Sequence, residues 1–295
     1  MTAHCVRLTL SKRCTTLLVS ALLGWGSLGI VTIQAQSGGR PRTVTQPPPT
    51  GSAEQEFPSP NAGRTTPPNV RRGSPLDIAQ VIERFTENES LLLQEFANYI
   101  YRQEVRMQTI GFDDRPTGEF YRLSEVSFTE SGQRREEVKR FPPSTLQGLQ
   151  ITPADLEDFG TTKPFSITRE NAPLYHIEYV TRERLDELDT YVFDVRPKRV
   201  PKFEQGGKRF FAGRVWVDTQ DLMVVKTAGR TLPEDRNNKF PRFESYRENI
   251  DGKFWFPTYV YADDTLEFPN QSIRIRLEIR YTNYRRFQTD VKVLD

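Results

Sequence analysis

Cysteine and histidine are nearly absent from this sequence. Of its 295 residues, two are cysteine and two are histidine, and both cysteines, Cys5 and Cys14, lie close to the start. Beyond residue 35 the one histidine is His176, for which we expect a satisfied position in a strand. Zinc sites and Cys–His nucleophiles need these residue types. We therefore expect no metal site, no cofactor and no disulfide to hold the fold.

Other catalytic signatures are missing too. The sequence has no phosphate-binding loop, no Gly-x-Gly-x-x-Gly and no serine in a Gly-x-Ser-x-Gly elbow. Paired carboxylates remain as the one source of acid–base chemistry, and they could hydrolyse a glycoside. The pairs are Asp113–Asp114, Asp218 with Asp221, and Asp263–Asp264. They stand beside expected hairpin turns, where aspartate satisfies turn amides, so we expect a protein that is not an enzyme.

Long apolar runs are absent except near the start. The basic residues Arg7, Lys12 and Arg13 precede an apolar run over 17–33, and small or polar residues surround Ala35. This order predicts a signal peptide over 1–35, an exported protein and a periplasmic location. The alternative is an uncleaved anchor, which would leave the protein associated with a membrane.

The next segment is too polar and too rich in turn-forming residues to build a core. Residues 36–74 are rich in Pro, Gly, Ser and Thr, and we expect a disordered tether there. A single domain over 75–295 should follow, opened by a helix that begins at Ser74–Pro75. Without the three leader cations, 38 basic residues face 39 acidic ones, a net charge of −1. This balance gives no argument for a nucleic-acid partner, and we expect a monomer.

The domain begins with an amphipathic pattern and continues with alternating ones. Apolar residues at helical spacing predict one N-terminal helix that runs almost directly into the first strand near Tyr99. From there apolar and polar residues alternate, most clearly over Ile273–Tyr281. The helical stripe consists of Ile78, Val81, Ile82, Phe85, Leu92, Phe96 and Tyr99.

Hairpin follows hairpin in this alternating region. Thr152 and Asp155 predict a short second helix over 152–159, opened by a capping box. The expected hairpins pair 119–130 with 133–140, 175–183 with 190–196, 213–218 with 222–227, and 240–249 with 253–262, before a last strand over 272–287.

These patterns predict a mainly β protein of the α+β class. We expect a curled antiparallel meander of about nine to eleven strands, because a sheet that wide must curl. It should form an incomplete β-barrel, with the N-terminal helix and short helices covering its concave face.

Three stretches of the sequence resemble a known superfamily. They are Tyr191–Lys198 (YVFDVRPK), Gly213–Asp218 (GRVWVD) and Asp251–Thr258 (DGKFWFPT). With the order of leader, helix and antiparallel meander, they are similar to the periplasmic lipoprotein-carrier superfamily, specifically its uncharacterised outer-membrane lipoprotein-sorting proteins. The resemblance implies a half-open barrel whose covered apolar concavity holds lipid or lipoprotein acyl chains.

The first hypothesis is therefore an exported, non-enzymatic protein that binds a lipid or acylated lipoprotein between sheet and helices. Transfer of this cargo towards the outer membrane is one role that such a protein would have. The second is a periplasmic interaction or sensor module that contacts a membrane-associated protein partner with the same fold. The third is a carboxylate-dependent hydrolase. Alternation along the strands gives the expected groove-lining residues: Leu92, Phe96, Ile177, Phe193, Val217, Phe256, Ile275 and Leu277.

Overall fold

The architecture comes from a computed structural model, which describes residues 77–129, 131–152, 155, 166–204 and 207–287. The expected signal peptide and tether lie outside the described residues. The elements are α1 (Ile78–Phe96), β1 (Tyr99–Ile110), β2 (Pro116–Phe128), β3 (Arg134–Arg140), β4 (Tyr175–Leu185), β5 (Leu188–Pro197), β6 (Phe210–Asp218), β7 (Val224–Leu232), β8 (Phe243–Asn249), β9 (Trp255–Phe268) and β10 (Gln271–Arg286).

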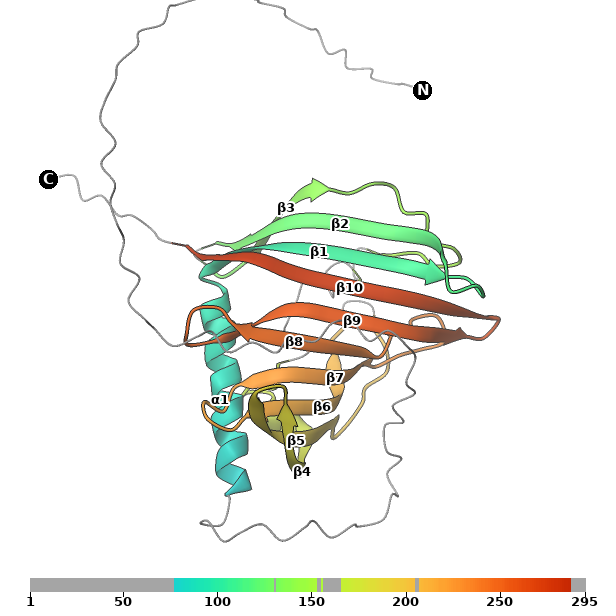
Figure 1. The fold of residues 1–295 in the computed structure, drawn as a ribbon. Coiled ribbons are helices and arrows are strands. Elements are labelled where there is room, and N and C mark those ends of the chain that lie inside the picture. Colours follow the sequence, from blue (N-terminus) through green and yellow to red (C-terminus); the bar gives the residue numbers. More distant parts are fainter. Residues whose placement is uncertain (1–76, 130, 153–154, 156–165, 205–206, 288–295) are drawn as a thin grey trace, which may run out of the picture. The chain divides into compact units, whose positions relative to one another are not determined.

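All ten strands belong to one antiparallel sheet with the order β3-β2-β1-β10-β9-β8-β7-β6-β5-β4 (Figure 1). The predicted meander and the strand number are confirmed. The first strand pairs with the last, for example Val105 with Ile279, so the chain breaks the meander once, between β3 and β4. The two edges, β3 and β4, do not meet, and the sheet is an open half-barrel as predicted.

The turns form where the sequence places them. Gly132 (φ 75°) lies in the β2–β3 turn, and Gly252 (φ 81°) lies between β8 and β9. Both adopt the left-handed conformation that glycine tolerates without strain. Asp186 (φ 50°) serves the same purpose between β4 and β5. Each turn therefore supplies the backbone reversal that a hairpin needs.

Helix α1 crosses one face of the sheet, which we call the inner face (Figure 1). The helix begins at Ile78, so the prediction of a start at Ser74–Pro75 is wrong. Asp77 is the N-cap, and its carboxylate accepts hydrogen bonds from the backbone N–H groups of Ala79 and Gln80. An aspartate here satisfies otherwise unpaired helix donors.

Aromatic contacts fix the path of α1 over the inner face. Near its start, the ring of Phe85 lies 5.3 Å from that of Phe193 on β5. At its end, Phe96 lies 5.8 Å from Phe256 on β9 and 5.1 Å from Tyr101 on β1. Only Ala97 and Asn98 separate the helix from β1, as the sequence predicts. The predicted helical stripe is thus the surface by which α1 packs on the sheet.

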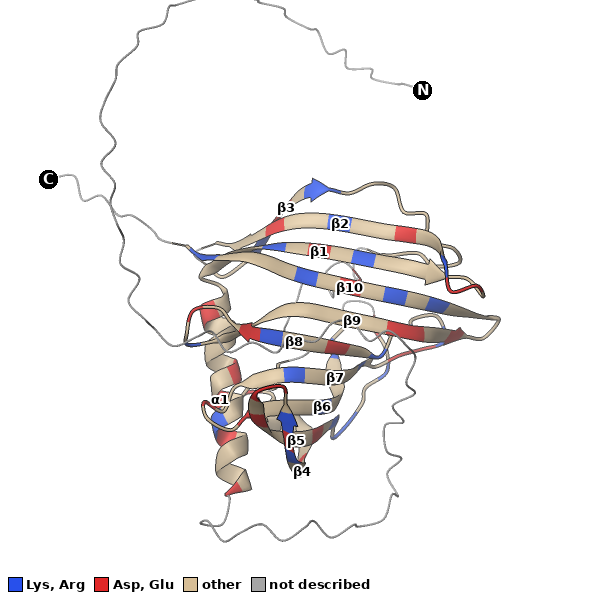
Figure 2. Ribbon diagram, viewed as in Figure 1, with Lys and Arg blue, Asp and Glu red and all other residues tan. Residues whose placement is uncertain are grey.

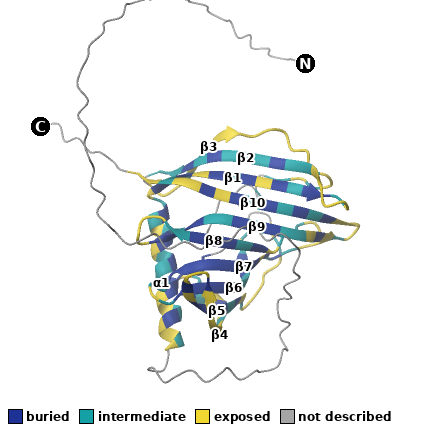
Figure 3. Cartoon of the chain, viewed as in Figure 1, coloured by how far each residue is buried: buried dark blue, intermediate teal, exposed yellow. Residues whose placement is uncertain are grey.

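The two faces of the sheet differ along most strands. Along β10, buried positions alternate with charged ones (Figures 2 and 3). Ile275, Leu277 and Ile279 are buried and face inward, so the arginines and Glu278 between them face outward. Arg280 lies directly across from Glu104 on β1. Strands β5 to β7 are buried on both faces over much of their length. The outer face is therefore charged around β1 and β10, and toward β5 it also carries charges, such as the pair of Asp194 with Arg214.

The connection from β3 to β4 returns across the sheet. The backbone N–H of Thr145 donates to the Glu119 carbonyl, and that of Arg169 donates to the Thr86 carbonyl of α1. Thr152 and Asp155 form the predicted capping box, in which each side chain accepts a hydrogen bond from the other's backbone N–H. The remainder of the expected second helix lies outside the described residues. Within the described ranges, no helix is both long and apolar enough to span a membrane.

Candidate functional site

The space between α1 and the sheet is almost completely filled. A void of about 10 Å³ remains there, with Leu92 and Phe96 of α1 on one side and Ser245, Arg247 and Val260 of the sheet on the other. This volume holds one water molecule at most. The predicted groove directly beneath the helix is therefore closed by the protein's own side chains.

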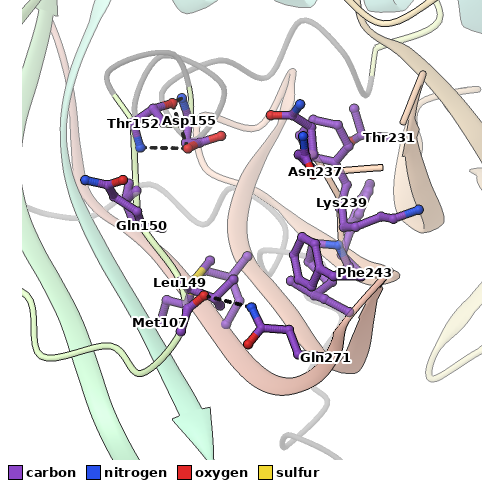
Figure 4. A pocket seen from close by; sticks show the side chains of 18 of the residues that line it. Met107, Leu149, Gln150, Thr152, Asp155, Thr231, Asn237, Lys239, Phe243 and Gln271 are labelled. Carbon is purple, nitrogen blue, oxygen red and sulfur yellow. Dashed lines mark hydrogen bonds between the residues drawn. The ribbon is translucent and has the colours of Figure 1, made fainter. Parts of the chain in front are cut away.

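A larger cavity lies beside α1 on the same inner face (Figure 4). Its volume is about 530 Å³, within the range of small-molecule sites. Its floor is apolar because the inward-pointing residues of β1, β8, β9 and β10 are apolar here. The floor consists of Met107, Phe243, Val260, Leu266, Leu277 and Ile279.

Three loops form the rim of the cavity. They are 148–152 after β3, 237–241 before β8, and the β9–β10 turn at Pro269–Asn270. Gly148 has a φ of 71°, a conformation that glycine adopts without strain, and the chain turns there toward the cavity. Local hydrogen bonds hold the second loop, where the Asp235 carboxylate accepts from the backbone N–H groups of Asn237 and Asn238.

Few charged residues line the cavity. Its charged residues, among those described, are Asp155 and Lys239. The Asp155 carboxylate is held by Thr152, and the Lys239 amine lies 3.9 Å from Glu234. Burial raises the pKa of Tyr281, another lining residue, to about 12, so its hydroxyl stays neutral.

A second hollow of about 640 Å³ lies beyond the loop that leads into β8. Lys239, Phe240 and Leu266 line both this hollow and the cavity, so they form the wall between them. Strand β8 begins only at Phe243, which leaves this loop to fill the place between the ends of β7 and β9. Charged side chains of both signs line the hollow: Asp194, Arg196, Arg230, Glu234, Arg242, Asp264 and Glu267.

The eight residues predicted to line a groove fall into three groups. Leu277 lies in the cavity floor. Leu92, Phe96 and Phe256 pack where α1 ends on the sheet. The other four lie in or against the core of the sheet: Ile177, Phe193, Val217 and Ile275. A ligand role for any of the eight stays a prediction.

Sequence reasoning missed most of the cavity. Met107 and Val260 follow the same inward alternation as Leu277, so their pattern could have placed them on the inner face. The rim gives no such signal, because loop residues such as Gln150 and Asn237 have no periodicity. These loops meet only through the fold.

The three acidic pairs hold turns and ion pairs. The buried Asp218 accepts from the backbone N–H groups of Gln220 and Asp221. Asp221 accepts from the Trp255 indole at 2.9 Å, and burial raises the pKa of its carboxyl. Asp263 pairs with Arg274 at 3.0 Å. None of the three pairs lines the cavity.

The structure also gives the position of His176. His176 lies on the edge strand β4, exposed, and directly across from Arg196 of β5. Across the described ranges, no three side chains of the His, Cys, Asp and Glu types gather closely enough to hold a metal ion.

An ionic cluster lies on the inner face toward the β3 edge. Glu136 accepts from Arg122 at 2.7 Å, from Arg134 at 2.6 Å and from Ser124 at 2.6 Å. Arg134 also donates to Gln103, which lies across from the cavity residue Tyr281. Burial alone would raise the pKa of Glu136, but the hydrogen bonds from Ser124 and Arg134 outweigh it and the pKa is lowered. This cluster anchors β3.

The cluster predicts a specific acid sensitivity. Because its folded pKa is lowered, Glu136 stabilises the fold fully above its unfolded pKa of about 4.3 and loses this effect as the pH falls through the folded value. We expect Glu136→Gln to lower the free energy of unfolding by about 1.5–3 kcal/mol at pH 7, the range for hydrogen bonds to charged groups. In urea titrations the difference from wild type should shrink below about pH 4.

The exposed neighbour Glu137 provides the control. Its side chain is 69% exposed, and Glu137→Gln should leave the free energy of unfolding unchanged at pH 7 and at pH 3. A Glu136→Gln effect that stays constant from pH 7 to pH 3 would contradict the assignment.

With the geometry in place, comparison with known proteins gives the following. No family model matches the sequence, and no curated protein matches it either. Solved structures do. A LolA superfamily protein from Nitrosomonas europaea matches with 15% identity and a TM-score of 0.30, over 73% of this chain and 96% of its own.

Two further structures are similar. A DUF1329 family protein from Desulfovibrio piger has 16% identity and a TM-score of 0.35, over 74% of this chain and 95% of its own. An outer membrane lipoprotein-sorting protein domain from Vibrio parahaemolyticus has 12% identity and a TM-score of 0.31, over 70% of this chain and 94% of its own. At these similarities, function has to be argued from this chain's own residues.

Proposed function

We propose that this protein is an exported binding protein that holds an acyl chain of a lipid or lipoprotein in the cavity beside α1. The supporting observation is the 530 Å³ cavity with an apolar floor, next to the filled space under α1. Protein interiors leave few voids larger than a water molecule, so a cavity of this size with an apolar floor supports a role in ligand binding.

The floor suits an alkyl chain. Val260, Leu277 and Ile279 present aliphatic side chains from neighbouring strands, and Ile279 lies directly across from Val260. Burial of alkyl surface yields about 0.8 kcal/mol per methylene. Binding and release would be the whole reaction, with no covalent bond made or broken. Export through a leader over 1–35 would place this activity in the periplasm.

A protein-binding role is the second candidate, because of the edge strand β4. Tyr179 and Val180 on this strand are 38% and 41% exposed, and β5 is its one neighbour in the sheet. An exposed edge can accept a strand from a partner protein. A bulge between Tyr179 and Thr181 interrupts the edge, so the partner's strand would pair along a short stretch.

The acyl-chain proposal predicts a dependence on chain length. Affinity for a series of n-alkyl probes with one head group should rise about fourfold per methylene, until the cavity is full, and then level off. Isothermal titration calorimetry measures each affinity. An affinity that does not change with chain length would refute acyl burial and favour the role of β4 in binding a protein.

A further inference from the structure

The rim of the cavity carries an unusual set of polar side chains. Five of its lining residues bear carboxamides: Gln150, Asn237, Asn238, Asn270 and Gln271. They come from all three rim loops, and Figure 4 shows Gln150, Asn237 and Gln271 around the opening. A carboxamide offers two N–H donors and a carbonyl acceptor but no charge. The carboxamides therefore give the rim neutral donors and acceptors above an apolar floor.

Several of these amides are available to a ligand. Asn238 donates to Asp235 at 2.8 Å, and Gln271 donates weakly to the Gly148 carbonyl at 3.4 Å. Among the residues that the structure describes, none hydrogen-bonds to the side chains of Gln150, Asn237 or Asn270, and all three are exposed. The backbone around Asn237 is fixed by the Asp235 turn, so that amide is presented on an ordered loop.

The charged residues described at the opening already have hydrogen-bond or ion-pair partners. Asp155 is held by Thr152, and Lys239 lies beside Glu234. Recognition of a phosphate or carboxylate normally uses arginine or lysine in close, often bidentate geometry. Among the described residues, no arginine lines the cavity: Arg134 belongs to the ionic cluster and Arg242 to the second hollow.

We propose that the cavity selects an amphiphile whose head group is neutral and rich in hydroxyl or amide groups, rather than a free fatty acid or an anionic phospholipid. The alkyl chain lies on the Leu277–Ile279 floor, and the head group hydrogen-bonds to Gln150, Asn237 and Asn270 at the rim. Sugar hydroxyls and the amides of an acylated peptide share this chemistry. This inference rests on the proposed function and names its ligand class.

Matched probes test the head group separately from the tail. Dodecyl glucoside, dodecanoyl-glycinamide, dodecyl phosphate and dodecyltrimethylammonium have similar tails and different heads. Below their micellar concentrations, the neutral probes should bind about tenfold more tightly than both charged ones, the effect of one or two net hydrogen bonds. The tighter of the two neutral probes identifies a sugar or a peptide as the source.

Variants assign the preference to the rim. In Gln150→Ala/Asn270→Ala the preference for neutral heads should fall to about twofold or less, while affinity for dodecyl phosphate stays unchanged. Gln80→Ala removes an exposed amide of α1 away from the cavity and should change neither. Asn237→Ala gives a second, single-site test, and circular dichroism verifies that each variant is folded.

The possible failures are distinguishable. If dodecyl phosphate binds as tightly as dodecyl glucoside, the head-group inference is wrong while the acyl-binding function stands. If no dodecyl probe binds the wild-type protein, the proposed function itself is wrong. A preference for neutral heads that survives in the double variant would also overturn the assignment to the rim.

Discussion

Replacing Arg247 by methionine is expected to lower the free energy of unfolding by about 3–5 kcal/mol, the range for removing one partner of a buried ion pair. Arg247 of β8 donates two hydrogen bonds to Glu89 of α1, at 2.6 and 2.9 Å. Their side chains are 6% and 1% exposed. The variant leaves the Glu89 carboxylate buried without its counter-charge, directly between helix and sheet.

Urea unfolding of three variants tests this expectation. The double variant Glu89→Leu/Arg247→Met removes both charges and should recover most of the loss, because apolar residues can replace a buried pair. Arg84→Met breaks an exposed pair of the same helix, 3.7 Å from Glu87, and should cost less than about 1 kcal/mol. If the double variant is no more stable than Arg247→Met, the loss does not come from an isolated buried charge.

Phe85→Ala is the second large effect, with an expected loss of about 3–5 kcal/mol. The rings of Phe85 and Phe193 lie 5.3 Å apart, and both side chains are completely buried. Truncation removes this contact and leaves a cavity beneath the start of α1, where the sheet cannot readily collapse. The result would mark this region as core that holds the helix, not as a ligand groove.

Thermal and urea unfolding measure the loss, with Leu91→Ala as the control on the same helix. Leu91 is 44% exposed, and its truncation should change stability by about 0.5 kcal/mol or less. If Phe85→Ala loses little stability but loses affinity for alkyl probes, the region under α1 is a binding groove after all, as the sequence first indicated.

Much of the fold could be predicted because its patterns are local. Alternation over Ile273–Tyr281 reflects one buried and one exposed face, and the turn residues at Ser131–Gly132 and Asp251–Gly252 mark the hairpins. Turn chemistry and periodicity act over a few residues, so one sequence suffices to read them. The strands, the helix and the open sheet followed from such signals.

Long-range pairing could not be predicted in the same way. Nothing near β1 indicates that it pairs with β10, more than 160 residues later in the chain. The ion pair between Glu89 and Arg247 also joins residues far apart in the sequence, but one local feature indicated that Glu89 has a partner. Glu89 interrupts the apolar stripe between Phe85 and Leu92, and a carboxylate on a buried helix face requires a partner.

The sequence predicted the type of the candidate site better than its location. An apolar concavity on the inner face was expected, and Leu277 lies in its floor. Side chains of α1 fill the space beneath the helix, so the open volume lies beside it. How much space side chains leave depends on packing in three dimensions, which alternation along a strand does not encode.

The most direct test of the central claim is native mass spectrometry of the protein expressed with its leader in a host of its native type. We predict one co-purifying acyl species per protein in the wild type and none in Met107→Trp, which fills the cavity floor. Arg106→Trp places the same bulk on the outward-facing neighbour and should retain the ligand. A wild-type protein that is free of ligand and binds none of the dodecyl probes would contradict the account.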